Sequence, residues 1–194
     1  TLLTDGPFMA YTLIMSLVLG GLFAIIAAFP FIFIERMGIP TEHYGYYYAF
    51  VVLAFFFGSL AVNRVADRFT SDQMLVAGLV LGVLGQLALV AIVALGWEDP
   101  IAMIATQCFF AFGLGLIFAT APVRAFDVCR AGHGYAAAML GALPMAGGGL
   151  STFCVVLTHN GTAWPITIIL LTNNTIACAL YLLVKPWRVR PGSA

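Results

Sequence analysis

The chain has 194 residues, of which 62% are hydrophobic and only 8% are charged, and its formal net charge is zero. Soluble domains carry roughly a quarter charged residues, so this chain has too few to form a hydrated surface. A nucleic-acid partner would require a basic surface, and the balanced charge gives no reason to expect one. The composition therefore predicts a membrane protein whose surface is largely covered by the lipid bilayer.

Six stretches of the sequence lack charged residues over about the 17 to 25 residues that a helix needs to cross the hydrocarbon core. In chain order they cover residues 8–34, 44–62, 74–95, 101–123, 134–156 and 164–184. The stretches are continuously apolar and do not alternate with a period of two, which favours helices over barrel strands. We therefore predict an all-α, polytopic membrane protein with six transmembrane helices in one bundle over residues 1–194.

The basic residues predict how these spans are oriented. When the connections are counted alternately, one side of the membrane carries Arg64, Arg68, Arg124, Arg130, Lys185, Arg188 and Arg190, and the other carries only Arg36. Because Lys and Arg are retained on the cytoplasmic side, we expect both termini to be cytoplasmic. The six spans then divide into two triples of opposite orientation, which predicts the 3+3 inverted repeat typical of secondary transporters.

Small residues and helix breakers gather in the fifth predicted span. Small residues recur every four positions and predict close packing against another helix or, alternatively, a sliding face: Gly134, Ala138, Ala142 and Ala146. Pro144 precedes three consecutive glycines that include Gly148, and both residue types weaken helical hydrogen bonding. Pro144 and Gly148 are therefore candidates for a conformational hinge, although membrane helices carry Pro and Gly commonly.

The sequence contains no enzyme signature, metal-ligand cluster or cofactor motif, so we expect a protein that is not an enzyme and binds no cofactor. No charged residue occupies the middle of a span, and proton coupling is therefore expected outside this chain. Polar and aromatic residues at membrane depth suggest a largely apolar substrate cavity; alternatively, these side chains pack between helices or face lipid. The candidate cavity residues are Phe23, Phe50, Gln107, Phe110 and Met139.

Several segments resemble drug exporters of the Bcr/CflA branch of the major facilitator superfamily. Residues 134–145 are similar to that branch's G-x-A-S-A-x-x-G-x-L-Q-M stretch, with Pro144 in place of Gln. Residues 58–69 resemble the second copy of the superfamily's cytoplasmic loop motif, but Thr70 replaces a usual Gly and residues 71–72 replace basic residues. Three further segments are similar to that branch: residues 43–45, residues 112–115 with Arg124, and residues 162–165. The resemblance therefore covers the whole chain, as the C-terminal six-helix half of such a transporter.

This resemblance implies proton-coupled antiport of lipophilic or cationic antimicrobials by alternating access, and hence multidrug efflux and antibiotic resistance. It also implies a bacterial inner-membrane location and an N-terminal six-helix half that supplies the proton-binding carboxylates. The partners would be that half, protons and a small drug-like substrate.

The resemblance also suggests gating residues near the predicted cytoplasmic side. Asp67 would dock against a helix N-terminus of the other half, where a carboxylate is favoured. The alternative is a solvated loop pair between Asp67 and Arg64 or Arg68. Arg124 and Asp127 are three residues apart and could pair at the end of the fourth span.

Two readings from other functional classes remain open on the sequence. The first is a self-sufficient six-helix channel or carrier acting as a homodimer, although the chain lacks a filter ring or charged pore. The second is a membrane scaffold subunit without transport activity.

Overall fold

The computed structural model describes residues 5–97, 99–129 and 132–184. Its elements are α1 (Gly6–Pro30), η2 (Phe31–Arg36), α2 (Thr41–Val65), α3 (Ser71–Ala94), α4 (Pro100–Val128), α5 (His133–Thr158) and α6 (Trp164–Val184). Six helices, with η2 extending α1, are long and apolar enough to cross a membrane. The predicted all-α fold with six membrane-spanning helices is confirmed. Of the basic residues used for orientation, Arg130, Lys185, Arg188 and Arg190 lie outside the described residues.

The starts of α3 and α4 are defined by side chains that cap them. The Thr70 hydroxyl accepts a hydrogen bond from Gln73 N at 3.3 Å, and Gln73 Oε1 accepts one from Thr70 N at 2.9 Å. This reciprocal capping box satisfies two backbone donors that a helix start leaves unpaired. Asp99 caps α4 by accepting from Ala102 N at 2.9 Å, and Pro100 occupies the first helical position.

The prolines inside the spans affect the helices in different ways. Pro30 is the last residue of α1, and the span continues as the π-helical turn η2. Proline removes one backbone donor and crowds the preceding turn, and a π-helical turn accommodates such a disturbance. Pro122 and Pro144 lie within α4 and α5, both of which continue past them.

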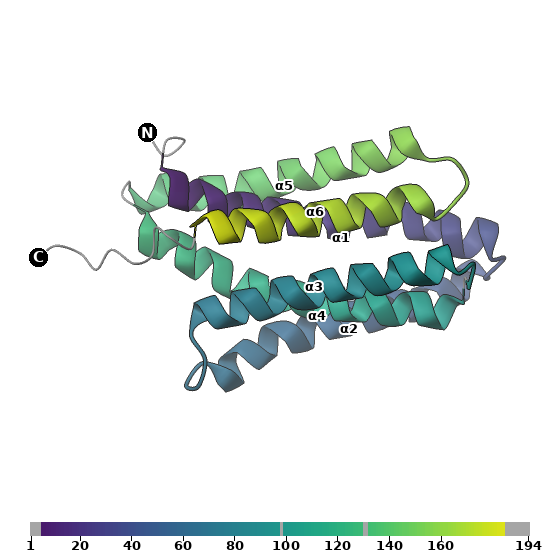
Figure 1. The fold of residues 1–194 in the computed structure, drawn as a ribbon, viewed down its shortest axis with the longest axis horizontal. Coiled ribbons are helices and arrows are strands. Elements are labelled where there is room, and N and C mark those ends of the chain that lie inside the picture. Colours follow the sequence, from purple (N-terminus) through teal and green to yellow (C-terminus); the bar gives the residue numbers. More distant parts are fainter. Residues whose placement is uncertain (1–4, 98, 130–131, 185–194) are drawn as a thin grey trace, which may run out of the picture.

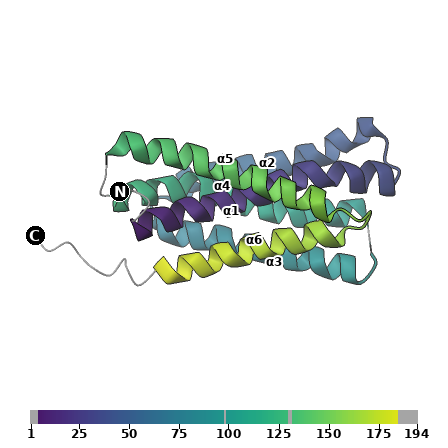
Figure 2. The same cartoon turned by 90° about the horizontal axis from the view of Figure 1, so that it is seen from above.

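The helices run lengthwise through one bundle, and α1 begins at the end where α6 stops (Figure 1). We call this end, where α2 and α4 end and α3 and α5 begin, the proximal end. At the opposite, distal end η2, α3 and α5 end and α2, α4 and α6 begin. Figure 2 shows the same lengthwise arrangement from above.

Helices α1 and α4 form the centre of the bundle. In their most apolar 18-residue segments 56% and 61% of residues are buried, against 11% in α2 and 17% in α5. Helix α5 packs on α1 and α2 packs on α4, while α3 and α6 contact each other and the central helices. Exchanging α1–α3 with α4–α6 reproduces this set of neighbours, as expected for two repeats of three helices. Two helices of each triple thus pack on the central helix of the other: α2 and α3 on α4, and α5 and α6 on α1.

Glycines bring α2 and α3 close to α4. A Cβ atom on Gly58 of α2 would collide with the Phe112 carbonyl oxygen of α4. A Cβ atom on Gly78 of α3 would lie 2.6 Å from the carbonyl oxygen of Gly113 on α4. Because small residues permit close backbone approach, these glycines allow the short distances from α2 to α4 and from α3 to α4.

Candidate functional site

An ion-pair network joins α3 and α4 at the proximal end. Arg124 Nε donates to Asp72 Oδ1 at 2.8 Å, and Arg124 Nη2 donates to Asp72 Oδ2 at 3.1 Å. Arg124 Nη1 donates to Asp127 Oδ2 at 3.0 Å. The side chains of Arg124 and Asp72 are only 23% and 24% exposed. This two-bonded arrangement fixes the guanidinium in orientation as well as in position.

Local structure positions each member of this network. Thr70 caps α3, which places Asp72 in the first turn, where the helix dipole favours a carboxylate. Arg124 and Asp127 are on the same side of α4 near its C-terminal end. The pair expected between Arg124 and Asp127 is present. The sequence reasoning missed Asp72 as the second partner, because only the fold brings the start of α3 beside the end of α4.

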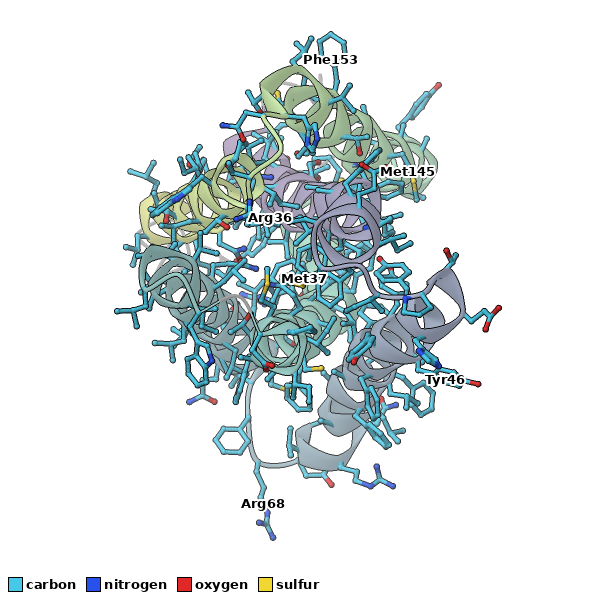
Figure 3. All side chains as sticks on the ribbon, turned by 90° about the vertical axis from the view of Figure 1, so that its right-hand side faces the viewer. Arg36, Met37, Tyr46, Arg68, Met145 and Phe153 are labelled. Atoms are coloured by element: carbon cyan, nitrogen blue, oxygen red, sulfur yellow. The ribbon has the colours of Figure 1, made fainter. Side chains whose placement is uncertain are left out.

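Arg64 in the last turn of α2 and the loop residues Asp67 and Arg68 are exposed near the connection between α2 and α3. Among the described residues no ion pair involves any of the three. Figure 3 shows Arg68 projecting away from the bundle. The loop-pair alternative therefore has no support in the described part of the chain, and docking of Asp67 against another half remains a proposal.

Two of the five candidate cavity residues lie in the packed interior of the bundle. Gln107 and Phe110 on α4 are both fully buried. Gln107 Oε1 accepts from Gln86 Nε2 of α3 at 3.4 Å. The ring of Phe110 lies 3.1 Å from the position that a Cβ atom on Gly21 of α1 would occupy. Both residues thus contribute contacts between helices within this half.

The other three candidates lie nearer the surface. Phe50 on α2 is 60% exposed, whereas Phe23 on α1 and Met139 on α5 are partly buried. A Cβ atom on Gly148 would lie 2.7 Å from Cδ2 of Phe23, so the structure brings this candidate hinge glycine and this candidate cavity residue together. Within this half, two of the five candidates are therefore buried and three are at least partly exposed.

An exposed face formed by α2 and α5 lies on the side of the bundle away from α3 and α6. We call it the α2–α5 face; Figure 3 shows Tyr46 of α2 and Met145 of α5 on this side, and these are 70% and 60% exposed. The small residues of α5 are exposed as well: Gly134, Ala138, Ala142 and Ala146. A Cβ atom on Gly134 or Gly141 would meet nothing within 4 Å. The small-residue face therefore has no partner helix among the described residues.

A cavity of about 270 Å³ opens at the distal end. It is lined by Phe31, Ile32, Glu35, Arg36, His159, Gly161 and Thr162. Arg36 Nη1 donates to the Gly161 carbonyl oxygen at 3.1 Å, which ties the end of η2 to the connection between α5 and α6. The rings of Phe31 and His159 are 5.3 Å apart. Within the described residues no group of three or more His, Cys, Asp or Glu side chains is placed to bind a metal ion.

Three curated proteins are similar to the chain, and no protein-family model matches it. An uncharacterized MFS-type transporter of Bacillus subtilis, YdgK, is 23% identical over 100% of the chain and 48% of the relative. A bicyclomycin resistance protein homolog of Haemophilus influenzae is 26% identical over 81% of the chain and 39% of the relative. A chloramphenicol resistance protein of Pseudomonas aeruginosa is 23% identical over 89% of the chain and 42% of the relative.

The chain therefore spans less than half the length of each of these relatives. All three matches agree with the resemblance drawn from the sequence motifs, and the six-helix bundle agrees with the fold that this resemblance implies. The chain is thus similar to part of an MFS-type transporter and to parts of two proteins named for antibiotic resistance.

Proposed function

We propose that the chain is the C-terminal half of a proton-coupled exporter of lipophilic or cationic antimicrobials that works by alternating access. The observation that carries this proposal is the exposed α2–α5 face. Helices α2 and α5 are apolar enough to span a membrane, yet they are the two least buried helices of the bundle. An N-terminal six-helix half would cover this face and share a central cavity with it.

The chemistry of the face supports an intramolecular partner. Its exposed stripe of Gly134, Ala138, Ala142 and Ala146 offers a surface on which another helix backbone can approach closely. The relatives are more than twice the length of this chain, which leaves room for a second unit of similar size. Phe50 and Met139 would then contribute to the substrate cavity, where apolar and aromatic side chains surround a few polar groups.

The ion-pair network and the hinge residues support alternating access. Arg124, Asp72 and Asp127 hold the proximal ends of α3 and α4 together. Asp67 would dock against the other half when the proximal end closes, and Arg68 would assist. Pro144 and Gly148 would let α5 bend against Phe23 of α1 as the cavity changes access. Proton-binding carboxylates would lie in the other half, since the six spans of this chain carry no charged residue at their middle.

The proposal is tested with the full-length protein reconstituted into proteoliposomes. A proton gradient should drive transport of chloramphenicol, bicyclomycin or a lipophilic organic cation, and collapsing the gradient should abolish it. Phe50→Ala should reduce transport without lowering thermal stability, because Phe50 is largely exposed within this half. Leu95→Ala is the control, since Leu95 is 78% exposed at the distal end of α3.

Two outcomes would overturn the proposal in favour of the other readings. Transport by this chain alone as a homodimer would support the self-sufficient carrier. Absence of gradient-driven transport of all three compounds by a folded, full-length protein would support the scaffold subunit.

A further inference from the structure

Three amide side chains are fully buried where α3, α4 and α6 meet: Gln86, Gln107 and Asn174. Gln86 Nε2 donates to Gln107 Oε1 at 3.4 Å, and Asn174 Nδ2 donates to the Leu170 carbonyl oxygen at 3.2 Å. The remaining oxygens, Gln86 Oε1 and Asn174 Oδ1, accept no hydrogen bond from the protein. Buried polar atoms are nearly always paired with protein or with ordered water. Two unpaired acceptors at one helix junction therefore indicate a missing donor.

Asn174 of α6 packs against Gly82 of α3, on the turn before Gln86. A Cβ atom on Gly82 would lie 2.6 Å from Asn174 Oδ1 and 3.7 Å from Cδ2 of Phe110. Gln86 is one helical turn beyond Gly82 on the same face of α3. Because helical side chains lean toward the N-terminus of their helix, we expect the carboxamide of Gln86 to lean toward Gly82. The glycine thus lets Asn174 Oδ1 approach α3 beside the turn that carries Gln86, and Phe110 is the apolar neighbour.

The two carbonyl oxygens favour a small, neutral hydrogen-bond donor. The occupant must offer two hydrogens to two uncharged carbonyl oxygens, and water does so. A metal cation is disfavoured, because the amide cluster supplies no carboxylate and desolvating an ion costs far more than desolvating a neutral molecule. Asp72 and Asp127, the acidic residues of α3 and α4 among the described residues, lie at the proximal end.

We propose that a single water molecule bridges Gln86 Oε1 and Asn174 Oδ1 and is a permanent part of this bundle. The water donates one hydrogen to each oxygen and so joins α3 of the first triple to α6 of the second. This junction lies between α3 and α6, away from the α2–α5 face. The bound water thus stabilises the contact between the two triples. This structural role does not depend on what the protein transports.

The first test is a double-mutant cycle on the thermal stability of the full-length protein in detergent. The variants are Gln86→Met, Asn174→Leu and the double variant. With a bridging water, Asn174→Leu lowers Tm, and the double variant loses less than the sum of the single losses. If Asn174 Oδ1 is simply unpaired, removing it relieves a penalty and raises Tm, which would overturn the proposal.

Asn173→Leu is the matched control, because it makes the same substitution at the neighbouring position. Asn173 Nδ2 donates to Ser151 Oγ of α5 at 3.1 Å, so this side chain belongs to a different junction. Its effect on Tm should add to that of Gln86→Met without coupling. Coupling as large as that of Asn174→Leu would show that the cycle reports general loosening of α6, and the water bridge would be rejected.

Two further measurements separate water from other occupants. A high-resolution structure of the full-length protein should show one density peak within hydrogen-bonding distance of both oxygens. Direct pairing of the two amides, or an empty space, would overturn the proposal. Replacing sodium chloride by choline chloride should leave Tm unchanged, whereas a sodium-specific rise in Tm that Asn174→Leu removes would assign the site to a cation instead.

Discussion

Arg124 and Asp72 are 52 residues apart in the sequence, yet two hydrogen bonds of 2.8 and 3.1 Å join their side chains. Asp72 lies where the loop motif that this segment resembles usually has a basic residue, so in this chain the start of α3 supplies the acid and α4 supplies the base. Thr70, which replaces the usual Gly, caps α3 and holds Asp72 in its first turn. The residues that depart from the motif thus form a helix cap and an ion pair, which together stabilise the start of α3.

Arg124→Ala should lower the free energy of unfolding by about 1–2 kcal/mol, because charge-assisted hydrogen bonds are lost while partial exposure weakens the effect. Efflux by the full-length protein should fall as well. Arg64→Ala is the control, since Arg64 is exposed and has no ion pair among the described residues. The double variant Arg124→Asp with Asp72→Arg should recover part of the lost stability. If Arg124→Ala leaves the stability unchanged and the double variant recovers none, the ion pair does not stabilise the protein.

Gly113→Ala should lower the free energy of unfolding by about 1–3 kcal/mol, the usual effect of overpacking a tight interior. The added methyl group would collide with the Gly78 carbonyl oxygen of α3. Gly6→Ala is the control at the start of α1, away from the α2–α5 face, where an added Cβ atom meets nothing within 4 Å. It should be neutral or stabilise the protein by about 0.5–1 kcal/mol through helix propensity. Thermal unfolding in detergent measures both, and equal effects would contradict the close approach of α3 and α4.

Gly148→Ala should weaken the packing of α5 on α1, because the new Cβ atom would lie 2.7 Å from Cδ2 of Phe23. The adjacent change Gly149→Ala should have little effect, since a Cβ atom there meets nothing within 4 Å. Adding Phe23→Leu to Gly148→Ala should restore most of the lost thermal stability by removing the ring. If the second substitution brings no relief, the contact between Phe23 and Gly148 is not the cause.

The orientation is tested by cysteine labelling of the full-length protein in intact cells, starting from a variant without the native cysteines. Arg68→Cys should react with a membrane-impermeant reagent only after the cells are permeabilised, because basic connections are retained in the cytoplasm. Trp97→Cys, at the distal end and 64% exposed in the wild-type side chain, should react without permeabilisation. The reverse pattern would invert the topology and, with it, the proposed direction of export.

The sequence was sufficient to predict the number, type and approximate limits of the spans. The predicted span over residues 164–184 coincides with α6, and the span predicted over residues 74–95 differs from α3 by three residues at its start. Apolar length is a local property, and the hydrocarbon thickness sets it for every span alike. The pairing of Arg124 with Asp127 was equally predictable, because residues three apart on a helix are neighbours.

Only the tertiary structure decided which spans are central and which side chains are buried. Gln107 and Phe110 were expected to line a cavity, and in this half they pack between helices instead of joining Phe50 near the surface. Spans that are apolar on all sides carry little periodic signal to distinguish a face that meets lipid from a face that meets another helix. Contacts such as Arg124 with Asp72, or Asn174 with Gly82, arise when distant helices meet, and the local sequence around each residue therefore does not contain them.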